Sequence, residues 1–250
     1  MRNVKLLYII TALRYSWFWL GTWAIYYSSF GGYSVIGLLE TVMIVTCILT
    51  EIPTGALADL LGKRKTLILS FFLSAIANIW MGFAPNVLNM ALSLVLLNIG
   101  GTFASGAFEA LVYDSLKQER KTNNYTRVLG NISTIRMLAL GVASVIGGYV
   151  AVYDIRLPYH LNGIGQIIAM FIAFLLIEPK IDSVKITIKG YLKQNVEGLN
   201  HLFRSVKVRN IVIPSLIVAA LVLILREGLD DILILDFGFK TRVVELGYIS

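Results

Sequence analysis

Charged residues are scarce in this chain of 250 residues. Lys, Arg, Asp and Glu make up 15% of it, against about 25% in an average soluble domain. Hydrophobic residues supply 57% of the chain, which is more apolar surface than one water-exposed domain can bury. The composition therefore excludes an ordinary soluble fold and predicts an all-α membrane protein, whose solvent is lipid.

Cysteine and histidine are almost absent. Cys47 is the only cysteine, and His160 and His201 are the only histidines, so neither a disulfide nor a zinc site of Cys and His ligands is expected. Cys47 falls within an apolar segment and the histidines fall far apart, which leaves no pair of a nucleophile and a base. We therefore expect no cofactor and no metal, and we do not expect an enzyme.

Long apolar runs take the place of charge. A membrane-spanning helix needs about 20 mostly apolar residues, and seven segments meet this requirement. They are residues 6–27, 34–58, 66–84, 87–113, 128–152, 157–177 and 210–235. The first is long and has no small-residue cleavage site, which favours an uncleaved helix over a signal peptide.

The basic residues are distributed unevenly between the two sides of these spans. Most of the 22 Lys and Arg residues fall on the side of the N-terminus, and only Arg156, Lys240 and Arg242 fall on the other. Because basic loops stay in the cytoplasm, this pattern predicts a multi-pass protein of the plasma membrane with a cytoplasmic N-terminus. The net charge of +7 is thus explained by topology, and no nucleic-acid partner is expected.

The order of the segments predicts three parts. Residues 1–178 form an N-terminal bundle of six spanning helices, and residues 210–250 hold a seventh helix, an outer loop and the start of an eighth. Residues 179–209 between them form an amphipathic cytoplasmic linker, with apolar residues at helical spacing on one face. We expect one complete half of a two-half protein, ending as its eighth helix begins, and therefore a fragment or a truncated product.

The joint between the second and third spans carries a motif. Gly55 allows a neighbouring helix to approach closely, Asp59 closes a helix, and Gly62 permits a turn with positive φ. The cations Lys63 and Arg64 then follow directly, on the predicted cytoplasmic side.

This spacing resembles the loop between helices 2 and 3 of the major facilitator superfamily, although Leu60 stands where a basic residue is usual and Lys63 where arginine is commoner. Residues 38–40, 51–55 and 105–116 resemble a prokaryotic drug-exporter branch of that family. Of the glycine-rich pattern of antiporters in helix 5, only Gly147 and Gly148 are present.

The resemblance implies a fold of two six-helix halves around a central cavity, of which this chain would hold one half and helix 7. It also implies that the motif loop locks the halves together on the cytoplasmic side. In that lock we expect a charge network of Asp59, Lys63, Arg64 and Asp114.

Four ionisable residues fall inside the predicted spans at one depth. Arg14, Glu51, Glu109 and Arg136 each lie eight or nine residues from a charge at the cytoplasmic end of their helix, about 12–13 Å into the membrane at 1.5 Å per residue. Charges at this depth are costly and mark transport pathways. We expect a buried polar layer in which Glu109 pairs with Arg136. The alternative is that such pairs only neutralise each other and fix helix packing.

Aromatic residues cluster in the first span. In a continuous helix Tyr15, Trp19, Trp23 and Tyr26 would share one face, and with Arg14 they would form an aromatic wall with one charge. Such a wall suits a cationic or amphipathic organic substrate, so Tyr15, Trp19 and Trp23 are candidates for substrate contact. The alternative is an aromatic belt at the membrane interface.

The function that the resemblance implies is secondary active transport of a small organic solute by alternating access. The resemblance favours ion-driven multidrug efflux, with protons or another ion as partner, together with lipid and the remaining C-terminal half. An uptake carrier and a non-transporting membrane scaffold or sensor remain as alternatives.

Overall fold

The computed structural model describes residues 2–179, 208–218 and 221–222. The described part is helical. Its elements are α1 (Arg2–Arg14), α2 (Trp23–Ser28), α3 (Tyr33–Leu61), α4 (Lys63–Gly82), α5 (Val87–Gln118), the 3₁₀ turn η1 (Thr122–Asn124), α6 (Tyr125–Ala151) and α7 (Leu157–Ala173). A short apolar helix, Val208–Val218, follows later. Most of the predicted linker and of the segment 210–250 lies outside the described residues.

Local sequence explains where several helices begin and end. Gly62, with φ at +86°, ends α3 and begins α4, which confirms the turn predicted there. Pro85 follows the end of α4, and the Asn86 side chain accepts a hydrogen bond from the Asn89 backbone N–H at 3.0 Å. That bond caps the first turn of α5. Pro158 lies in the first turn of α7, where its missing N–H costs nothing.

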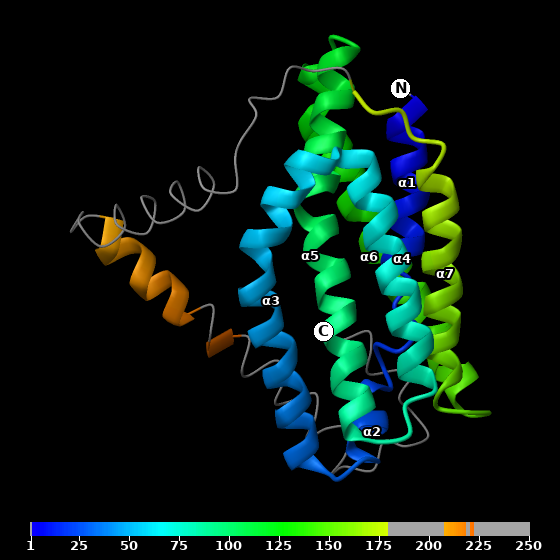
Figure 1. Cartoon of the computed structure of the whole chain (residues 1–250). Coiled ribbons are helices and arrows are strands. Elements are labelled where there is room, and N and C mark those ends of the chain that lie inside the picture. The colour runs from blue at the N-terminus through cyan, green and yellow to red at the C-terminus, as the bar shows by residue number, and fades with distance from the viewer. Residues whose placement is uncertain (1, 180–207, 219–220, 223–250) are drawn as a thin grey trace.

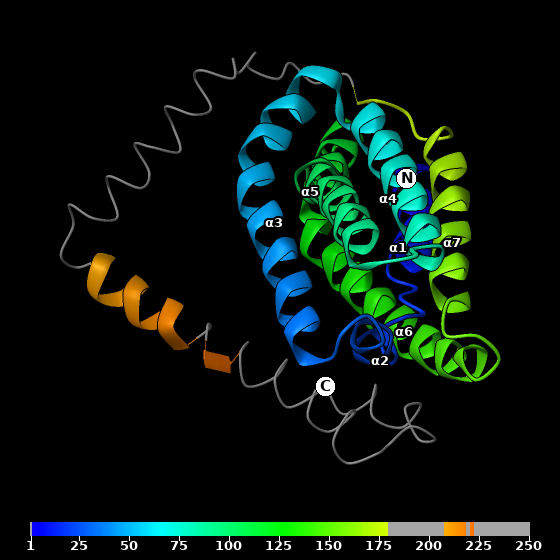
Figure 2. The ribbon, with the colours of Figure 1, turned by 60° about the horizontal axis from the view of Figure 1, so that its bottom comes forward.

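The helices form one bundle in which α4 packs against both α5 and α7, α3 packs against α5, and α1 packs between α6 and α7. Figure 2 shows α3 at the edge of the bundle and α5 inside it. In Figure 1 the N-terminus lies at the same end of the bundle as the turn between α3 and α4, whereas α2 lies at the opposite end.

Two apolar clusters make up the core. One surrounds the N-terminal half of α1 and includes Leu7, Ile10, Phe71 and Leu111. The other surrounds α2 and includes Trp23, Leu39 and Met81, together with Tyr159. Residues 14–19 connect the two along the chain. Trp19 packs against the core around α2, and Arg14, Tyr15, Trp17 and Trp19 line cavities.

The predicted continuous helix over residues 6–27 is wrong. Helix α1 ends at Arg14, residues 15–22 run through irregular turns, and α2 begins at Trp23. Aromatic residues and Gly21 are poorer helix formers than alanine or leucine. Non-helical backbone at membrane depth is tolerated where it lies within protein or lines a cavity, and this segment does both.

The sixth predicted span is also shorter than expected, because α7 ends at Ala173 and not at Ile177. Residues 176–179 leave the helix, which frees the Ile177 backbone and the Glu178 side chain to bind other segments. Of the described helices, α3, α4, α5 and α6 are long and apolar enough to cross a membrane.

Candidate transport site

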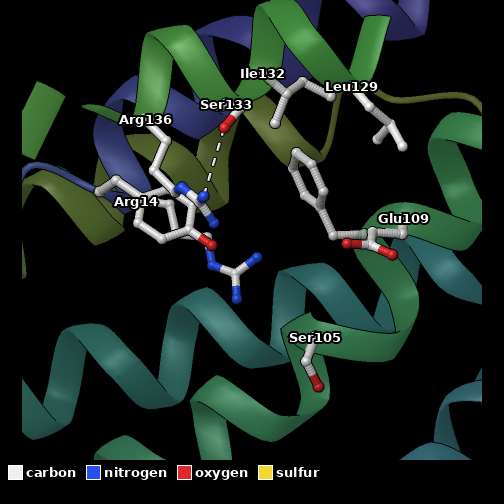
Figure 3. Close-up of a pocket in the computed structure, with 9 residues that line it drawn as sticks. Arg14, Ser105, Glu109, Leu129, Ile132, Ser133 and Arg136 are labelled. Atoms are coloured by element: carbon white, nitrogen blue, oxygen red, sulfur yellow. Dashed lines mark hydrogen bonds between the residues drawn. The ribbon is translucent and has the colours of Figure 1, made fainter. Parts of the chain in front are cut away.

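A cavity of about 300 Å³ lies among α1, α5 and α6, and we call it the charged cavity. Its lining residues are Arg14, Tyr15, Ser105, Phe108, Glu109, Leu129, Ile132, Ser133 and Arg136. Figure 3 shows the two arginines on one side of this cavity and Glu109 on the other. Three of the four residues predicted to form a charged layer therefore meet here.

Arg14 is the last residue of α1, where the negative end of the helix dipole favours a cation. Its guanidinium lies 5.2 Å from the Tyr15 ring centroid and 5.7 Å from that of Phe108, within the range of cation–π attraction. The carbonyl of Arg14 accepts hydrogen bonds from Trp17 Nε1 at 3.1 Å and from Gln166 Nε2 at 3.4 Å. These two hydrogen bonds satisfy a carbonyl at the C-terminal end of α1, and no carboxylate takes part in them.

The expected pairing of Glu109 with Arg136 is not formed in the described part of the chain. Arg136 Nη2 instead lies 3.5 Å from Ser133 Oγ, and its guanidinium lies 5.6 Å from the Tyr15 ring centroid. Tyr15 therefore contacts both arginines. Glu109 is exposed and lies on the other side of the cavity from both arginines (Figure 3).

Glu51 does not line this cavity. It lies on α3 with an exposed side chain, and its Oε2 is 3.7 Å from Cys47 Sγ on the same helix. Glu51 was predicted at the same depth as Arg14, Glu109 and Arg136. It lies apart from them because α3 packs on α5 at the edge of the bundle.

Arg14 also lines a second cavity, of about 320 Å³, which we call the aromatic cavity. Its lining comes from residues 14–19 and from α3, α4, α5 and α7: Arg14, Tyr15, Trp17, Trp19, Met43, Ser70, Phe71, Ser74, Leu97, Asn98, Gly101, Ala104, Asn162 and Gln166. Arg14 and Tyr15 line both cavities. They form the wall between them.

Trp17 and Trp19 stack on each other with centroids 5.3 Å apart and ring planes 15° apart. Residues two apart on a helix do not face each other, so this stack exists because the helix is broken. Trp19 also stacks on Tyr159 of α7 at 6.4 Å. Trp23 belongs to the core around α2, with an edge contact to Tyr27, and lines neither of these two cavities.

Next to the aromatic cavity, α4 and α7 are joined by buried amides. The side-chain amides of Asn162 and Asn78 lie 2.7 Å apart and are hydrogen-bonded to each other, and Asn78 Nδ2 donates to the Ser74 carbonyl at 2.7 Å. Because an unpaired amide in this environment is costly, the pair fixes how the two helices sit at the depth of the aromatic cavity.

The motif loop lies at the end of the bundle that also contains Asn3, and we call this the Asn3 end. Lys63 Nζ forms an ion pair with Asp114 of α5. Gly55 lies in the last part of α3, and the side chain of Asp59 lies outside what the structure describes. Arg64 Nη2 donates to the Phe174 carbonyl at 2.6 Å, so this cation holds the end of α7.

Glu178 and Asn3 complete this arrangement. The Glu178 carboxylate accepts from the backbone N–H of Lys63 at 2.8 Å and of Arg64 at 2.7 Å. Asn3 Nδ2 donates to Ser115 Oγ at 2.9 Å and to the Ile177 carbonyl at 2.7 Å, and Asn3 Oδ1 accepts from the Ile177 N–H at 3.0 Å. Segments from α1, α4, α5 and the end of α7 are thereby tied together.

Sequence reasoning missed Glu178, Asn3 and Trp17. A signal for Glu178 was present, because it precedes the helix-breaking Pro179 on the side where the motif loop emerges. Asn3 and Trp17 had no such signal, since their roles depend on where α7 and α1 end.

A sequence model of the family described as Major Facilitator Superfamily matches residues 6–248. The chain belongs to the major facilitator superfamily. Among related members of the superfamily, the MFS-type transporter YxaM of Bacillus subtilis is 23% identical over 86% of this chain and 53% of its own length.

Two relatives carry names that refer to resistance. Multidrug resistance protein 2 of Bacillus subtilis is 27% identical over 58% of this chain and 36% of its own length. The quinolone resistance protein NorA of Staphylococcus aureus is 24% identical over 64% of this chain and 39% of its own length. The chain thus spans about half or less of the length of these relatives.

The fold matches a solved structure of the peptide transporter POT in complex with sulfate. The TM-score is 0.55 at 14% identity, over 88% of this chain and 45% of the other.

Proposed function

We propose that this transporter exports small organic solutes across the plasma membrane by alternating access, driven by an ion gradient. The observation that carries the proposal is the charged cavity, in which two arginines and one carboxylate line about 300 Å³ at membrane depth. Ionisable residues are retained at such depth where they serve a substrate or an ion. The names of two relatives, which refer to multidrug and quinolone resistance, favour export.

Glu109 is our candidate for the coupling group. Its carboxylate lines the charged cavity opposite two guanidinium groups, and it is the only acidic residue among the described residues that line the cavity. When it is ionised the three charges sum to +1, and when it binds a proton they sum to +2. A proton taken up here would therefore change the charge that a substrate meets, which is the requirement for coupling.

The Asn3 end is our candidate for the cytoplasmic gate. Its ion pair between Lys63 and Asp114 and the contacts of Glu178 at the start of α4 hold the motif loop to its own half. Alternating access requires each half to move as a rigid body, and these contacts supply rigidity where the halves would separate.

Membrane vesicles of known orientation test the direction of transport. Everted vesicles from cells that express the gene should accumulate a fluorescent quinolone when energised, and right-side-out vesicles should not. Accumulation in right-side-out vesicles would make the protein an uptake carrier. Failure in both orientations with quinolones and other amphipathic dyes would favour a non-transporting scaffold.

The Glu109→Gln variant tests coupling. It should bind the solute but lose accumulation driven by a pH gradient, because glutamine cannot exchange a proton. The matched control is Glu119→Gln, which removes a carboxylate from the loop after α5. Unchanged pH-driven accumulation in Glu109→Gln would remove Glu109 as the coupling group.

A further inference from the structure

The proposals for export and for the cytoplasmic gate assign no role to the aromatic cavity. The described residues that line it belong to residues 14–19 and to α3, α4, α5 and α7. Arg14 is the one charged residue among those that line it, and the other polar lining groups are hydroxyls and amides.

Arg14 retains hydrogen-bond donors for a ligand. In the described part of the chain its side chain forms no ion pair and no hydrogen bond, and its contacts are the rings of Tyr15 and Phe108. A guanidinium presents a planar fork of donors that matches a carboxylate in a bidentate manner. Such a group at membrane depth is costly unless something pairs with it, and an anionic ligand would supply that pairing.

The walls beside Arg14 suit a flat ring. Trp17 and Trp19 form a stacked pair, and Met43 and Phe71 line the same space. Asn98 Nδ2 donates to the Leu94 carbonyl at 2.9 Å, which fixes the side chain so that its oxygen can accept from a ligand. Aromatic rings in contact are stabilised beyond the area that they bury.

We propose that the aromatic cavity binds a small aromatic organic anion, with the carboxylate on Arg14 and the ring against Trp17 and Trp19. A cavity of about 320 Å³ is at the small end of ligand sites, so the ligand carries one or two fused rings. This inference rests on the proposed function insofar as the bound anion is a transport substrate. It differs from the expectation of a cationic or amphipathic substrate, because a cation here would face Arg14, and the described lining of this cavity holds no carboxylate.

Calorimetric titration of the whole chain in lipid nanodiscs tests the site with three matched probes: naphthoate, naphthamide and naphthylmethylammonium. Naphthoate should bind at least about tenfold more tightly than the neutral amide, since a charged hydrogen bond contributes about 1.5–3 kcal/mol. The ammonium probe should bind more weakly than the amide. Equal affinities for the anion and the amide would overturn the proposal.

Variants locate the site. Arg14→Gln should remove the preference for naphthoate and leave naphthamide binding unchanged, and Arg14→Lys should retain part of the preference. The matched control Arg127→Gln removes one exposed arginine from α6 and should change neither affinity. If Arg136→Gln lowers naphthoate affinity as much as Arg14→Gln does, the anion lies in the charged cavity and the proposal is wrong.

If Arg14→Gln gives no monodisperse protein, a second variant, Trp17→Leu, tests the site. It should weaken the binding of naphthoate and of naphthamide by several-fold. Unchanged affinities for both probes would overturn the proposed site. Transport is scored separately in vesicles. If naphthoate binds but nothing is transported, the proposed export is wrong and the anion site stands. If a quinolone is exported but naphthoate does not bind, the anion site is wrong and the proposed export stands.

Discussion

Gly147 shows how much a single residue decides in this bundle. It lies buried in α6, and a Cβ built on it would overlap the carbonyl oxygen of Phe18 in the broken part of the first membrane segment. The backbone of α6 therefore lies directly against residues 15–22. The position of the wall between the two cavities depends on this contact, because Tyr15 belongs to the same irregular stretch.

We expect Gly147→Ala to destabilise the protein by about 1–3 kcal/mol or more, since neither backbone can move aside easily. The matched control is Gly130→Ala on the same helix, where nothing lies within 4 Å of the added Cβ. There alanine should stabilise the helix by up to about 1 kcal/mol, because glycine is the poorer helix former. Thermal unfolding in detergent, followed by size-exclusion chromatography, compares the two. Equal stability of both variants would contradict the close contact.

The structural roles of single residues could be predicted from the sequence to different extents. The positive φ of Gly62 follows from local chemistry, because two helices meet there in a tight turn. Gly147 could be recognised as part of a glycine pair, but its partner could not, since Phe18 was assigned to a continuous helix. Of the four residues that the depth estimate grouped together, Arg14, Glu109 and Arg136 line one cavity and Glu51 does not, because depth along a helix says nothing about which way a side chain points.

At the scale of elements, the first turn of α4 is stabilised by Glu178, a residue that follows α7 and lies far from α4 in the sequence. The first N–H groups of a helix have no partner within it, and in α4 two of them bind Glu178. A carboxylate at this position also interacts favourably with the helix dipole. Glu178 thus caps α4 and sets where the chain leaves α7.

Glu178→Ala should loosen the start of α4. We expect a loss of about 1–2 kcal/mol, typical of a removed cap, and faster hydrogen exchange at the Lys63 and Arg64 amides. The matched control is Asp154→Ala, which removes a carboxylate that accepts from the Arg156 N–H at 2.9 Å at the opposite end of the bundle. Protection at residues 63 and 64 that stays the same in both variants would show that Glu178 does not cap α4.

The ion pair between Lys63 and Asp114 joins α4 to α5, and charge reversal tests it. Their side chains are 21% and 13% exposed, so each single variant, Lys63→Asp or Asp114→Lys, should cost about 2 kcal/mol, between the values for exposed and fully buried pairs. The double variant should recover at least half of that loss. Additive losses in a double-mutant cycle of thermal stabilities would argue against a direct pair.

Most helices could be predicted from hydropathy because lipid makes long apolar runs unmistakable. The break after Arg14 could not, since it has no proline and depends on stacking between Trp17, Trp19 and Tyr159. The early end of α7 was hidden for a similar reason. Its residues 176 and 177 are as apolar as the helix before them, and tertiary contacts of Asn3, Arg64 and Glu178 hold this part of the chain outside the helix.

At the scale of the whole molecule, the two ends of the bundle differ in kind. The Asn3 end holds hydrogen bonds and an ion pair between segments distant in sequence, together with basic residues of the motif loop. The opposite end holds α2 and the aromatic core around it. The charged cavity and the aromatic cavity lie between these ends, which is the arrangement that alternating access requires.

This polarity leads to a prediction about orientation. Lys65 follows the turn that begins α4 at the Asn3 end, and Tyr153, which is 87% exposed, lies between α6 and α7 at the other. Because basic loops remain in the cytoplasm, Lys65 should lie inside the cell and Tyr153 outside. In a Cys47→Ser background, a membrane-impermeant maleimide should label Tyr153→Cys in intact cells and Lys65→Cys only after permeabilisation. The reverse pattern would invert the topology, and with it the assignment of the Lys63–Asp114 pair to a cytoplasmic gate.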